Sequence, residues 1–232
     1  MTVKANGVHH IAFSTADMKT QLEFFTDVLG MPLVGLFPMH GVPGGLHAFL
    51  EASPDCSISF VQLPAMAGIE VEFGRTHAGN ATQPTAPGTL QHLALHVDDD
   101  EALIAIRNRI RSRGVNVLGP IDHGLCRSIY FAGPEGLTLE IATSDQAIDP
   151  RAWIDPETVA AIGVDEEGLA RLVEPDAYES PAVPVPQPPL DPSRPHLRYP
   201  KPVYEKLLQM SDEELSKAIS YPEPPVRPRD RA

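Results

Sequence analysis

Cysteine, positive charge and long apolar runs are all scarce in this chain of 232 residues. No apolar stretch approaches the ~20 residues that a transmembrane helix needs, so we expect no membrane association. The two cysteines are too few for a disulfide framework, and the first residues lack the apolar core of a secretory signal, which favours a cytoplasmic protein. Lys and Arg total 18 against 31 Asp and Glu, and the net charge of −13 would repel a phosphate backbone, so no nucleic-acid partner is expected.

Proline is abundant but unevenly distributed, since 16 of the 25 prolines lie from Pro150 onward. Because proline fixes φ and has no N–H to donate, we expect residues 180–202 to run extended over a surface or a partner chain. Short helices are predicted on both sides of this run, one capped by Asp155 and one starting with the capping box of Ser211 and Glu214. Disorder is expected beyond residue 220.

The first 145 residues contain a repeat. The stretch VHHIAF at 8–13 matches LQHLALHV at 90–97, so that His10 and His92 occupy the same register 82 positions apart. Both stretches read as strands, and the same order of elements follows each of them. The repeat therefore predicts two modules of the same topology.

Each predicted strand is followed by an amphipathic helix, over residues 17–29 in the first half and 98–113 in the second. Asp98 and Glu101 have capping-box spacing, and a glycine ends each helix, at Gly30 and Gly114. Three strand-like runs come next: MPLVGLF, HAFLEA and SISFVQL in the first half, and VNVLGP, SIYFA and LTLEIAT in the second.

These elements predict an α+β fold, in which two βαβββ modules pair edge to edge into a curved mixed sheet around a shared cleft, plus a Pro-rich C-terminal arm. The expected divisions are a first module at 1–63, a linker loop at 64–89, a second module at 90–145, and an extension with short helices at 146–232.

Three residues of the repeat form a candidate metal triad: His10, His92 and Glu140. Histidine is uncommon on an apolar strand, and its presence at one register of both modules suggests that two imidazoles converge on the cleft. Glu140 lies among core residues of LTLEIAT, where a carboxylate is costly unless it is paired or binds a metal. Two histidines and one carboxylate leave open coordination positions and suit non-haem Fe(II), with Mn(II) as an alternative.

Residues 7–145 resemble the vicinal oxygen chelate superfamily, which includes glyoxalase I, antibiotic-resistance proteins and extradiol ring-cleaving dioxygenases. In that family the first strand of each module and the last strand hold a metal, and these strands here carry the triad. The resemblance is nearest to the extradiol branch, whose signature matches the stretch IDHGLCRSIYFAGPEGLTLE at Ile121, His123, Ile129, Tyr130, Pro134, Gly136 and Glu140.

The resemblance implies that His123 and Tyr130 are catalytic, hydrogen-bonding the substrate oxygens and moving protons. Two positions depart from the family pattern. Gly133 stands where the family prefers a polar residue before the proline, and Ser59 stands in the first module where the second has Glu140. The four-ligand set of glyoxalase I is therefore incomplete, which argues against a glyoxalase.

The preferred hypothesis is an Fe(II)-dependent dioxygenase that uses O₂ to cleave a small dihydroxylated aromatic ring. Its rivals are a metal-dependent isomerase, epimerase or lyase of the glyoxalase type, and a non-enzymatic protein that sequesters a small molecule such as a drug. The acid–base residue is left open among His123, His47 and His77. Phe13, Leu46, Phe49, Phe60 and Phe131 are candidates for an apolar wall or for the core.

The Pro-rich arm has few hydrogen bonds to gain within its own chain. We therefore expect it to cross a neighbouring subunit, which predicts a homodimer or a larger homo-oligomer. His9 is expected to face away from the cleft, because side chains alternate along a strand.

Overall fold

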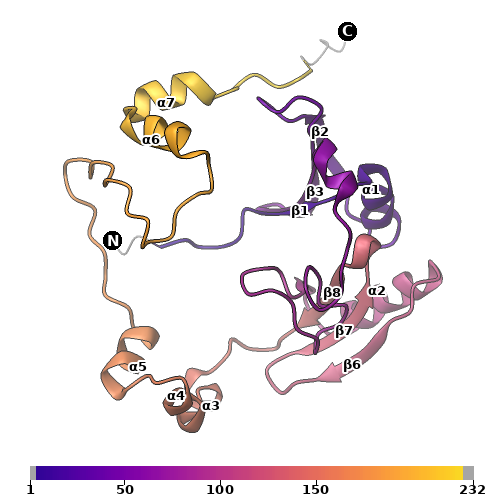
Figure 1. The fold of residues 1–232 in the computed structure, drawn as a ribbon. Coiled ribbons are helices and arrows are strands. Elements are labelled where there is room, and N and C mark those ends of the chain that lie inside the picture. The colour runs from indigo at the N-terminus through magenta and orange to yellow at the C-terminus, as the bar shows by residue number, and fades with distance from the viewer. Residues whose placement is uncertain (1–3, 227–232) are drawn as a thin grey trace. The chain divides into compact units, whose positions relative to one another are not determined.

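A computed structural model describes residues 4–226 and divides the chain into two compact parts. The larger part spans residues 6–176, and the smaller comprises the described residues 177–226 together with residues 4 and 5. The larger part contains both repeats (Figure 1). Among the described residues, no helix is long and apolar enough to cross a membrane.

The first module follows the order predicted from the sequence. Its sheet has the strand order β1-β4-β3-β2, with β1 parallel to β4 and the other neighbours antiparallel. The helix α1 packs on β3 and β4. The elements are β1 (His10–Ser14), α1 (Met18–Asp27), β2 (Leu33–Pro38), β3 (Leu46–Ser53) and β4 (Cys56–Gln62).

The second module repeats this topology with the strand order β5-β8-β7-β6, and α2 packs on β7 and β8. Its elements are β5 (Leu93–His96), α2 (Asp100–Ser112), β6 (Leu118–Asp122), β7 (Arg127–Ala132) and β8 (Thr138–Thr143). The strand β6 begins later than predicted from VNVLGP. Its register shifts between Leu118 and Ile121, around Pro120, which has no N–H for the ladder.

The helix predicted over residues 17–29 spans Met18–Asp27, and the one predicted over 98–113 spans Asp100–Ser112. Gly30 and Gly114 have φ of 81° and 78°, as expected of helix-ending glycines. The predicted cap of the second helix was wrong by one residue, because the side chain of Asp99, and not that of Asp98, accepts a hydrogen bond from Ala102 N. Successive aspartates all have capping chemistry, so only the backbone path decides which one caps.

The C-terminal region contains short helices separated by extended chain. The predicted cap at Asp155 and the capping box of Ser211 and Glu214 are both confirmed. No helix or strand occurs over residues 180–200. The helices are α3 (Pro150–Trp153), α4 (Pro156–Ala161), α5 (Glu166–Val173), α6 (Lys201–Gln209) and α7 (Asp212–Ile219).

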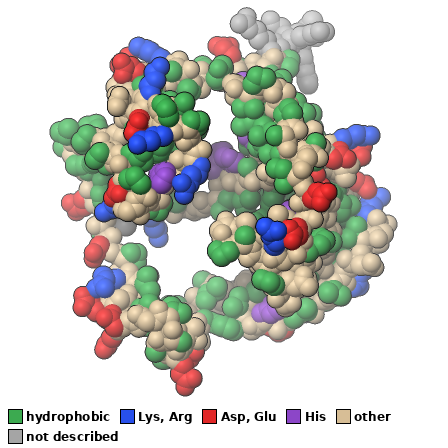
Figure 2. All heavy atoms as spheres, in the orientation of Figure 1, with side chains coloured by type: hydrophobic (Ala, Val, Ile, Leu, Met, Phe, Trp, Pro, Cys, Tyr) green, Lys and Arg blue, Asp and Glu red, His purple; other side chains and the backbone are tan. Residues whose placement is uncertain are grey.

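Apolar side chains of the arm remain exposed to solvent. Val183, Val185 and Leu197 are 73%, 70% and 63% exposed, and Figure 2 shows hydrophobic side chains among charged ones over α6 and α7. Residues 221–226 form no helix or strand, and the rest of the segment predicted to be disordered, 227–232, lies outside the described residues.

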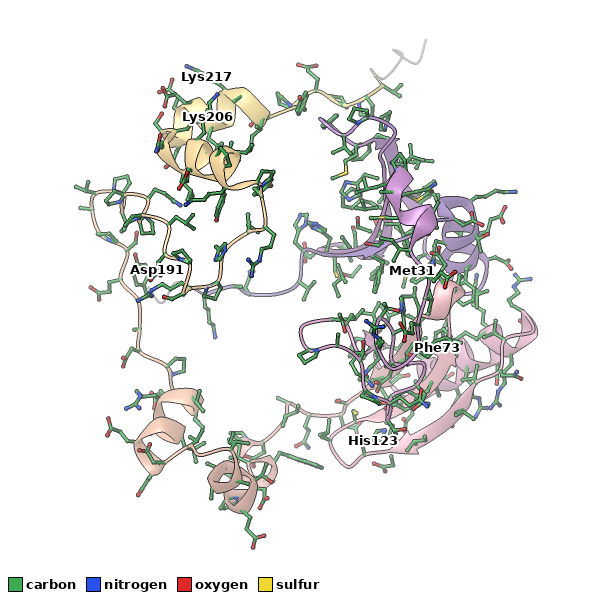
Figure 3. The ribbon with its side chains drawn as sticks, viewed as in Figure 1. Met31, Phe73, His123, Asp191, Lys206 and Lys217 are labelled. Atoms are coloured by element: carbon green, nitrogen blue, oxygen red, sulfur yellow. The ribbon has the colours of Figure 1, made fainter. Side chains whose placement is uncertain are left out.

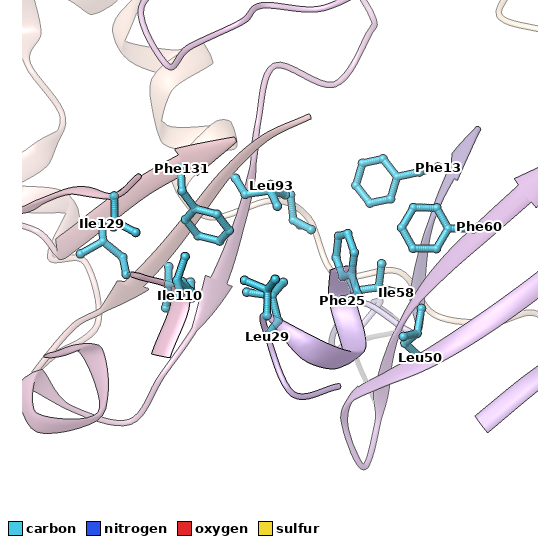
Figure 4. Packing of buried hydrophobic residues seen from close by; sticks show 14 of the residues in the cluster. Phe13, Phe25, Leu29, Leu50, Ile58, Phe60, Leu93, Ile110, Ile129 and Phe131 are labelled. Atoms are coloured by element: carbon cyan, nitrogen blue, oxygen red, sulfur yellow. The ribbon is translucent and has the colours of Figure 1, made fainter. Parts of the chain in front are cut away.

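One hydrophobic core joins the two modules. Phe25 and Ile110, from the two helices, are fully buried, and Leu29 lies between them (Figure 4). Alternate residues of the strands complete the core, including Ile58, Phe60, Ile129, Phe131 and Leu139. Because side chains alternate along a strand, the intervening residues lie on the opposite face of each sheet. The functional candidates lie on that outer face.

The α+β class and the paired βαβββ modules are thus confirmed. The edge strands β1 and β5 do not form a ladder with each other, so this chain has two four-stranded sheets and not one continuous sheet. The modules are held instead by the shared core and by hydrogen bonds between them. Arg109 on α2, for example, donates to the carbonyls of Asp27 and Val28 at the end of α1, at 2.9 and 3.0 Å.

A half-buried acidic residue also joins the modules. Glu135 lies in the short helix η2 (Pro134–Gly136) before β8, with a φ of 52° that non-glycine residues rarely adopt. Its carboxylate accepts hydrogen bonds from Thr15 Oγ1, Ala16 N and Gln21 Nε2 at 2.5, 2.8 and 2.8 Å. Burial alone would raise the pKa of Glu135, but these hydrogen bonds outweigh burial and lower it. We call this contact the Glu135 clasp.

We predict that Glu135→Ala lowers the free energy of unfolding by about 2 kcal/mol, because it leaves donors of the first module unpaired. The melting temperature, followed by circular dichroism, should fall by about 5 °C at neutral pH. Since the folded-state pKa is lowered, the stabilisation is present above the unfolded-state pKa and is lost as the pH falls through the folded-state value. The difference between variant and wild type should therefore shrink in acid.

Glu51→Ala provides the matched control, because Glu51 is an exposed carboxylate whose side chain has no hydrogen-bond or ion-pair partner in the described structure. Equal melting temperatures for Glu135→Ala and Glu51→Ala would contradict a stabilising role for the clasp.

Candidate functional site

The second module places four of the five predicted site residues in one row across its sheet. The ladder pairs Glu140 on β8 with Ala94 on β5 and with Tyr130 on β7. His92 directly precedes β5, and His123 directly follows β6 at the far edge of the sheet, where Figure 3 labels it. We call His92, Glu140, Tyr130 and His123 the polar row. The strand order thus brings together residues that are 48 positions apart at the most (140 minus 92).

His92 and Glu140 are in direct contact. His92 Nε2 lies 2.9 Å from Glu140 Oε2, and the Glu140 side chain is only 6% exposed. The other ring nitrogen of His92 is hydrogen-bonded to the side-chain oxygen of Gln91. A buried carboxylate is costly without a partner, and the imidazole of His92 is the partner of Glu140 in this sheet. An imidazole nitrogen and a carboxylate oxygen are also ligands that suit Fe(II) or Mn(II).

Tyr130 and His123 form the other half of the row. The Tyr130 hydroxyl lies 3.0 Å from His123 Nε2. Burial raises the pKa of Tyr130, and the nearby carboxylate of Glu140 raises it further. Tyr130 is therefore a neutral phenol at physiological pH, able to donate its proton in a hydrogen bond.

His10 does not join the row. It is exposed on β1 in the first module, where its Nδ1 lies 2.9 Å from His9 Nδ1 and its ring contacts that of Phe49. Over residues 4–226, no three His, Cys, Asp or Glu side chains form a group that could hold a metal ion. The described part of one chain therefore brings together two of the three predicted ligands, His92 and Glu140, which is one donor too few for the triad.

The first module has a different surface at the corresponding place. Ser59 pairs with Ala12 and Phe49 in the ladder, as Glu140 pairs with Ala94 and Tyr130, so Ser59 is the structural equivalent of Glu140. The Ser59 hydroxyl is fully buried and lies 2.7 Å from His47 Nε2. Burial lowers the pKa of His47, and the nearby His10 lowers it further, so His47 is neutral at physiological pH.

Aromatic side chains surround this serine and histidine. We call Phe37, His40, His47 and Phe49 the aromatic face. Of the predicted wall candidates, Phe49 lies on this face, whereas Phe13, Phe60 and Phe131 are core residues. Leu46 is partly buried and packs against the core.

The linker brings His77 to the start of the second module. His77 hydrogen-bonds Thr76 Oγ1 at 2.9 Å and lines a cavity of about 150 Å³ together with His92 and Thr138. Another linker residue, Phe73, covers Gly136, where a Cβ would come within 3.1 Å of the ring (Figure 3). The three acid–base candidates thus have separate positions: His123 in the polar row, His47 on the aromatic face and His77 beside His92.

Sequence reasoning missed Glu135, Phe37 and His40. Glu135 shows no periodicity because it lies in a turn, and its partners are more than 100 positions away. The only signal was an acidic residue between proline and glycine. Phe37 alternates within its strand as a core or surface residue would, so its place on the aromatic face depends on the pairing of β2 with β3.

Comparison with known proteins gives one family. The model of the Glyoxalase/Bleomycin resistance protein/Dioxygenase superfamily matches residues 7–141. A putative ring-cleaving dioxygenase, MhqA of Bacillus subtilis, is 27% identical over 62% of this chain and 42% of its own length, so this chain spans about two fifths of that relative.

Two further relatives are named for other reactions. A 2-epi-5-epi-valiolone epimerase of Actinomyces sp is 29% identical over 59% of this chain and 79% of the relative. A lactoylglutathione lyase of Pseudomonas aeruginosa is 26% identical over 57% of this chain and 80% of the relative.

Solved structures were also matched. A glyoxylase/bleomycin resistance protein/dioxygenase domain from Frankia sp. EAN1pec is 14% identical over 61% of this chain and 99% of that chain, with a TM-score of 0.49. The antibiotic binding protein TnmS3 from Streptomyces sp. CB03234 is 23% identical over 62% and 99%, with a TM-score of 0.44.

We predict that the negative charge of Glu140 raises the pKa of Tyr130. In protein labelled with ¹³C at the tyrosine ring, the Tyr130 signal, assigned with Tyr130→Phe, should titrate above the ordinary value of 10.0. Glu140→Gln removes the charge and keeps the side-chain shape, so the midpoint should move down toward that value. A midpoint that Glu140→Gln leaves unchanged would show that the carboxylate does not act on the phenol.

Proposed function

We propose that this chain, which belongs to the Glyoxalase/Bleomycin resistance protein/Dioxygenase superfamily, is the subunit of an Fe(II)-dependent extradiol-type dioxygenase that cleaves a small dihydroxylated aromatic ring. The observation that supports this best is the polar row, which sets a nitrogen and a carboxylate donor beside a neutral phenol and an imidazole. Three of these four side chains, His123, Tyr130 and Glu140, lie at positions of the extradiol signature.

Each member of the row has a role in this proposal. His92 and Glu140 are two of the metal ligands, and the third would be His10. When bound, Fe(II) would supply a Lewis acid and a template that holds the ring diol next to O₂. The Tyr130 phenol donates a hydrogen bond to a substrate oxygen. His123, which already contacts that phenol, accepts or returns the proton.

One feature disfavours a glyoxalase-type reaction. The first module has Ser59, bonded to His47, at the position equivalent to Glu140. A second carboxylate ligand is therefore missing from this strand. Epimerisation or lyase chemistry, the reactions for which two relatives are named, is kept as an outcome of the experiment below.

We predict O₂ consumption when the anaerobically Fe(II)-loaded protein is mixed with members of a panel of catechols, hydroquinones and aminophenols. Glu140→Ala should abolish both the uptake and the retained iron, because the carboxylate ligand is lost. Glu51→Ala, a carboxylate of the first module outside the proposed site, should change neither. Tightly held iron with no uptake across the panel would reject the dioxygenase in favour of an isomerase or lyase, and absence of bound metal would favour a binding protein.

In this proposal the third ligand comes from a second copy of the chain. The shared core, the Glu135 clasp and the contact of Arg109 with α1 fix the two modules relative to each other, so His10 cannot approach Glu140 of its own chain without breaking these contacts. His10 is exposed on β1, and β1 and β5 are unpaired sheet edges, which are ready to meet another chain. We therefore infer that a second copy supplies His10.

The C-terminal arm fits this assembly. Its valines and leucine are largely exposed, and exposed apolar side chains grouped along one segment are typical of an interaction surface. We propose that the arm helps to hold the copies of a homodimer or larger homo-oligomer together.

Mixing two inactive variants tests where the third ligand comes from. His10→Ala and Glu140→Ala should each retain no iron alone. Coexpressed in equal amounts, they should recover about a quarter of the wild-type iron, because half of the dimers would be mixed and each mixed dimer would have one intact site. No recovery in verified mixed dimers would show that His10 acts within its own chain or not at all. Iron retention by His10→Ala alone would remove His10 from the ligand set.

A further inference from the structure

The aromatic face of the first module has no role yet in the proposed reaction. Phe49 is its centre, because its ring contacts His10, Phe37 and His47 at centroid distances of 5.7, 6.0 and 4.4 Å. Phe37 lies nearly parallel to Phe49, with 15° between the ring planes, and its ring also stacks with that of His40, with 28° between the planes. Flat rings with nearly parallel planes form a surface on which another flat ring can stack.

The aromatic face lies next to the proposed metal ligand His10. Phe49 contacts His10 directly, so a ring that rests against Phe49 also lies next to His10. Phe37, His47 and Phe49 are all half-buried, which means that part of each ring is still accessible. Core-facing residues of β3 and of the neighbouring β4, Ala48 and Phe60, are fully buried and are not available to a ligand.

The charges of this face restrict what it can bind. The aromatic face and the polar row contain no Lys or Arg. The residues of the adjacent strands β1 and β4 that face the same side are also uncharged or are histidine: His10, Ala12, Ser14, Ser57, Ser59 and Val61. An anionic group on a ring would lose water on entering such a surface and would find no Lys or Arg there with which to pair. An uncharged, apolar substituent would meet no such cost.

We propose that Phe37, His47 and Phe49 form the wall on which the substrate ring stacks, and that the substrate is a dihydroxylated ring with uncharged, apolar substituents. This inference rests on the proposed function, since it assigns a substrate class to the same site. His47, whose Nε2 lies 2.7 Å from the fully buried Ser59 hydroxyl, gives this wall a polar ring edge.

Binding without turnover separates this inference from the dioxygenase reaction. The Fe(II)-loaded full-length protein is titrated anaerobically, by isothermal calorimetry, with 3-methylcatechol and with 3,4-dihydroxybenzoate. Both have the same diol for the metal, so the ratio of their dissociation constants reports on the surroundings of the ring. Methylcatechol should bind at least tenfold more tightly.

Phe49→Leu keeps an apolar side chain of similar size, so it should fold, but it has no flat ring. It should weaken the binding of methylcatechol about five- to tenfold. Leu36→Ala, an exposed apolar truncation on the neighbouring strand β2, is the matched control and should leave binding unchanged. Phe37→Arg adds a cation to the wall and should reduce the preference for methylcatechol over dihydroxybenzoate.

Equal affinity for the two catechols, or unchanged binding in Phe49→Leu, would overturn the assignment of this face. Binding as expected without any O₂ consumption would leave the wall in place and reject the proposed reaction. Binding of neither catechol would overturn the inference as well.

Discussion

The burial of one face of each sheet in a single core is the constraint on which the rest of the structure depends. Because side chains alternate along a strand, placing Ile58, Phe60, Ile129 and Leu139 in the core forces their neighbours onto the outer face. Ser59 and Tyr130 are such neighbours, and Glu140 follows Leu139. A shift of one residue in any of these strands would bury the functional side chains and expose the core.

The two modules use the same topology for different surfaces. Equivalent ladder positions hold Glu140 and Tyr130 in the second module, but Ser59 and Phe49 in the first. The outer face of the second module therefore carries polar groups of the kinds that can bind a metal and move protons. The first holds the aromatic rings of Phe37 and Phe49 and the exposed His10. In the proposed function the site uses both kinds of surface, which would account for the difference between the two halves of the repeat.

The contacts between the modules limit how that site can be completed. The Glu135 clasp reaches from the turn before β8 to the residues after β1, so it links the two strands that carry Glu140 and His10. Its unusual backbone angle indicates that the surrounding contacts hold this residue in place. Modules held this firmly present fixed surfaces, and assembly with another chain can then complete a site without rearrangement within each chain.

The sequence by itself determined the two βαβββ modules, most helix and strand positions, and the grouping of Glu140, Tyr130 and His123, because periodicity, caps and an ordered motif are local signals. It could not determine that His10 lies apart from His92, since register fixes which face a side chain is on and not the distance between two modules. Nor could it find Glu135 or the aromatic face, whose contacts join residues from separate elements. Only the tertiary structure decided these features, because they depend on how the packed core orients one module against the other.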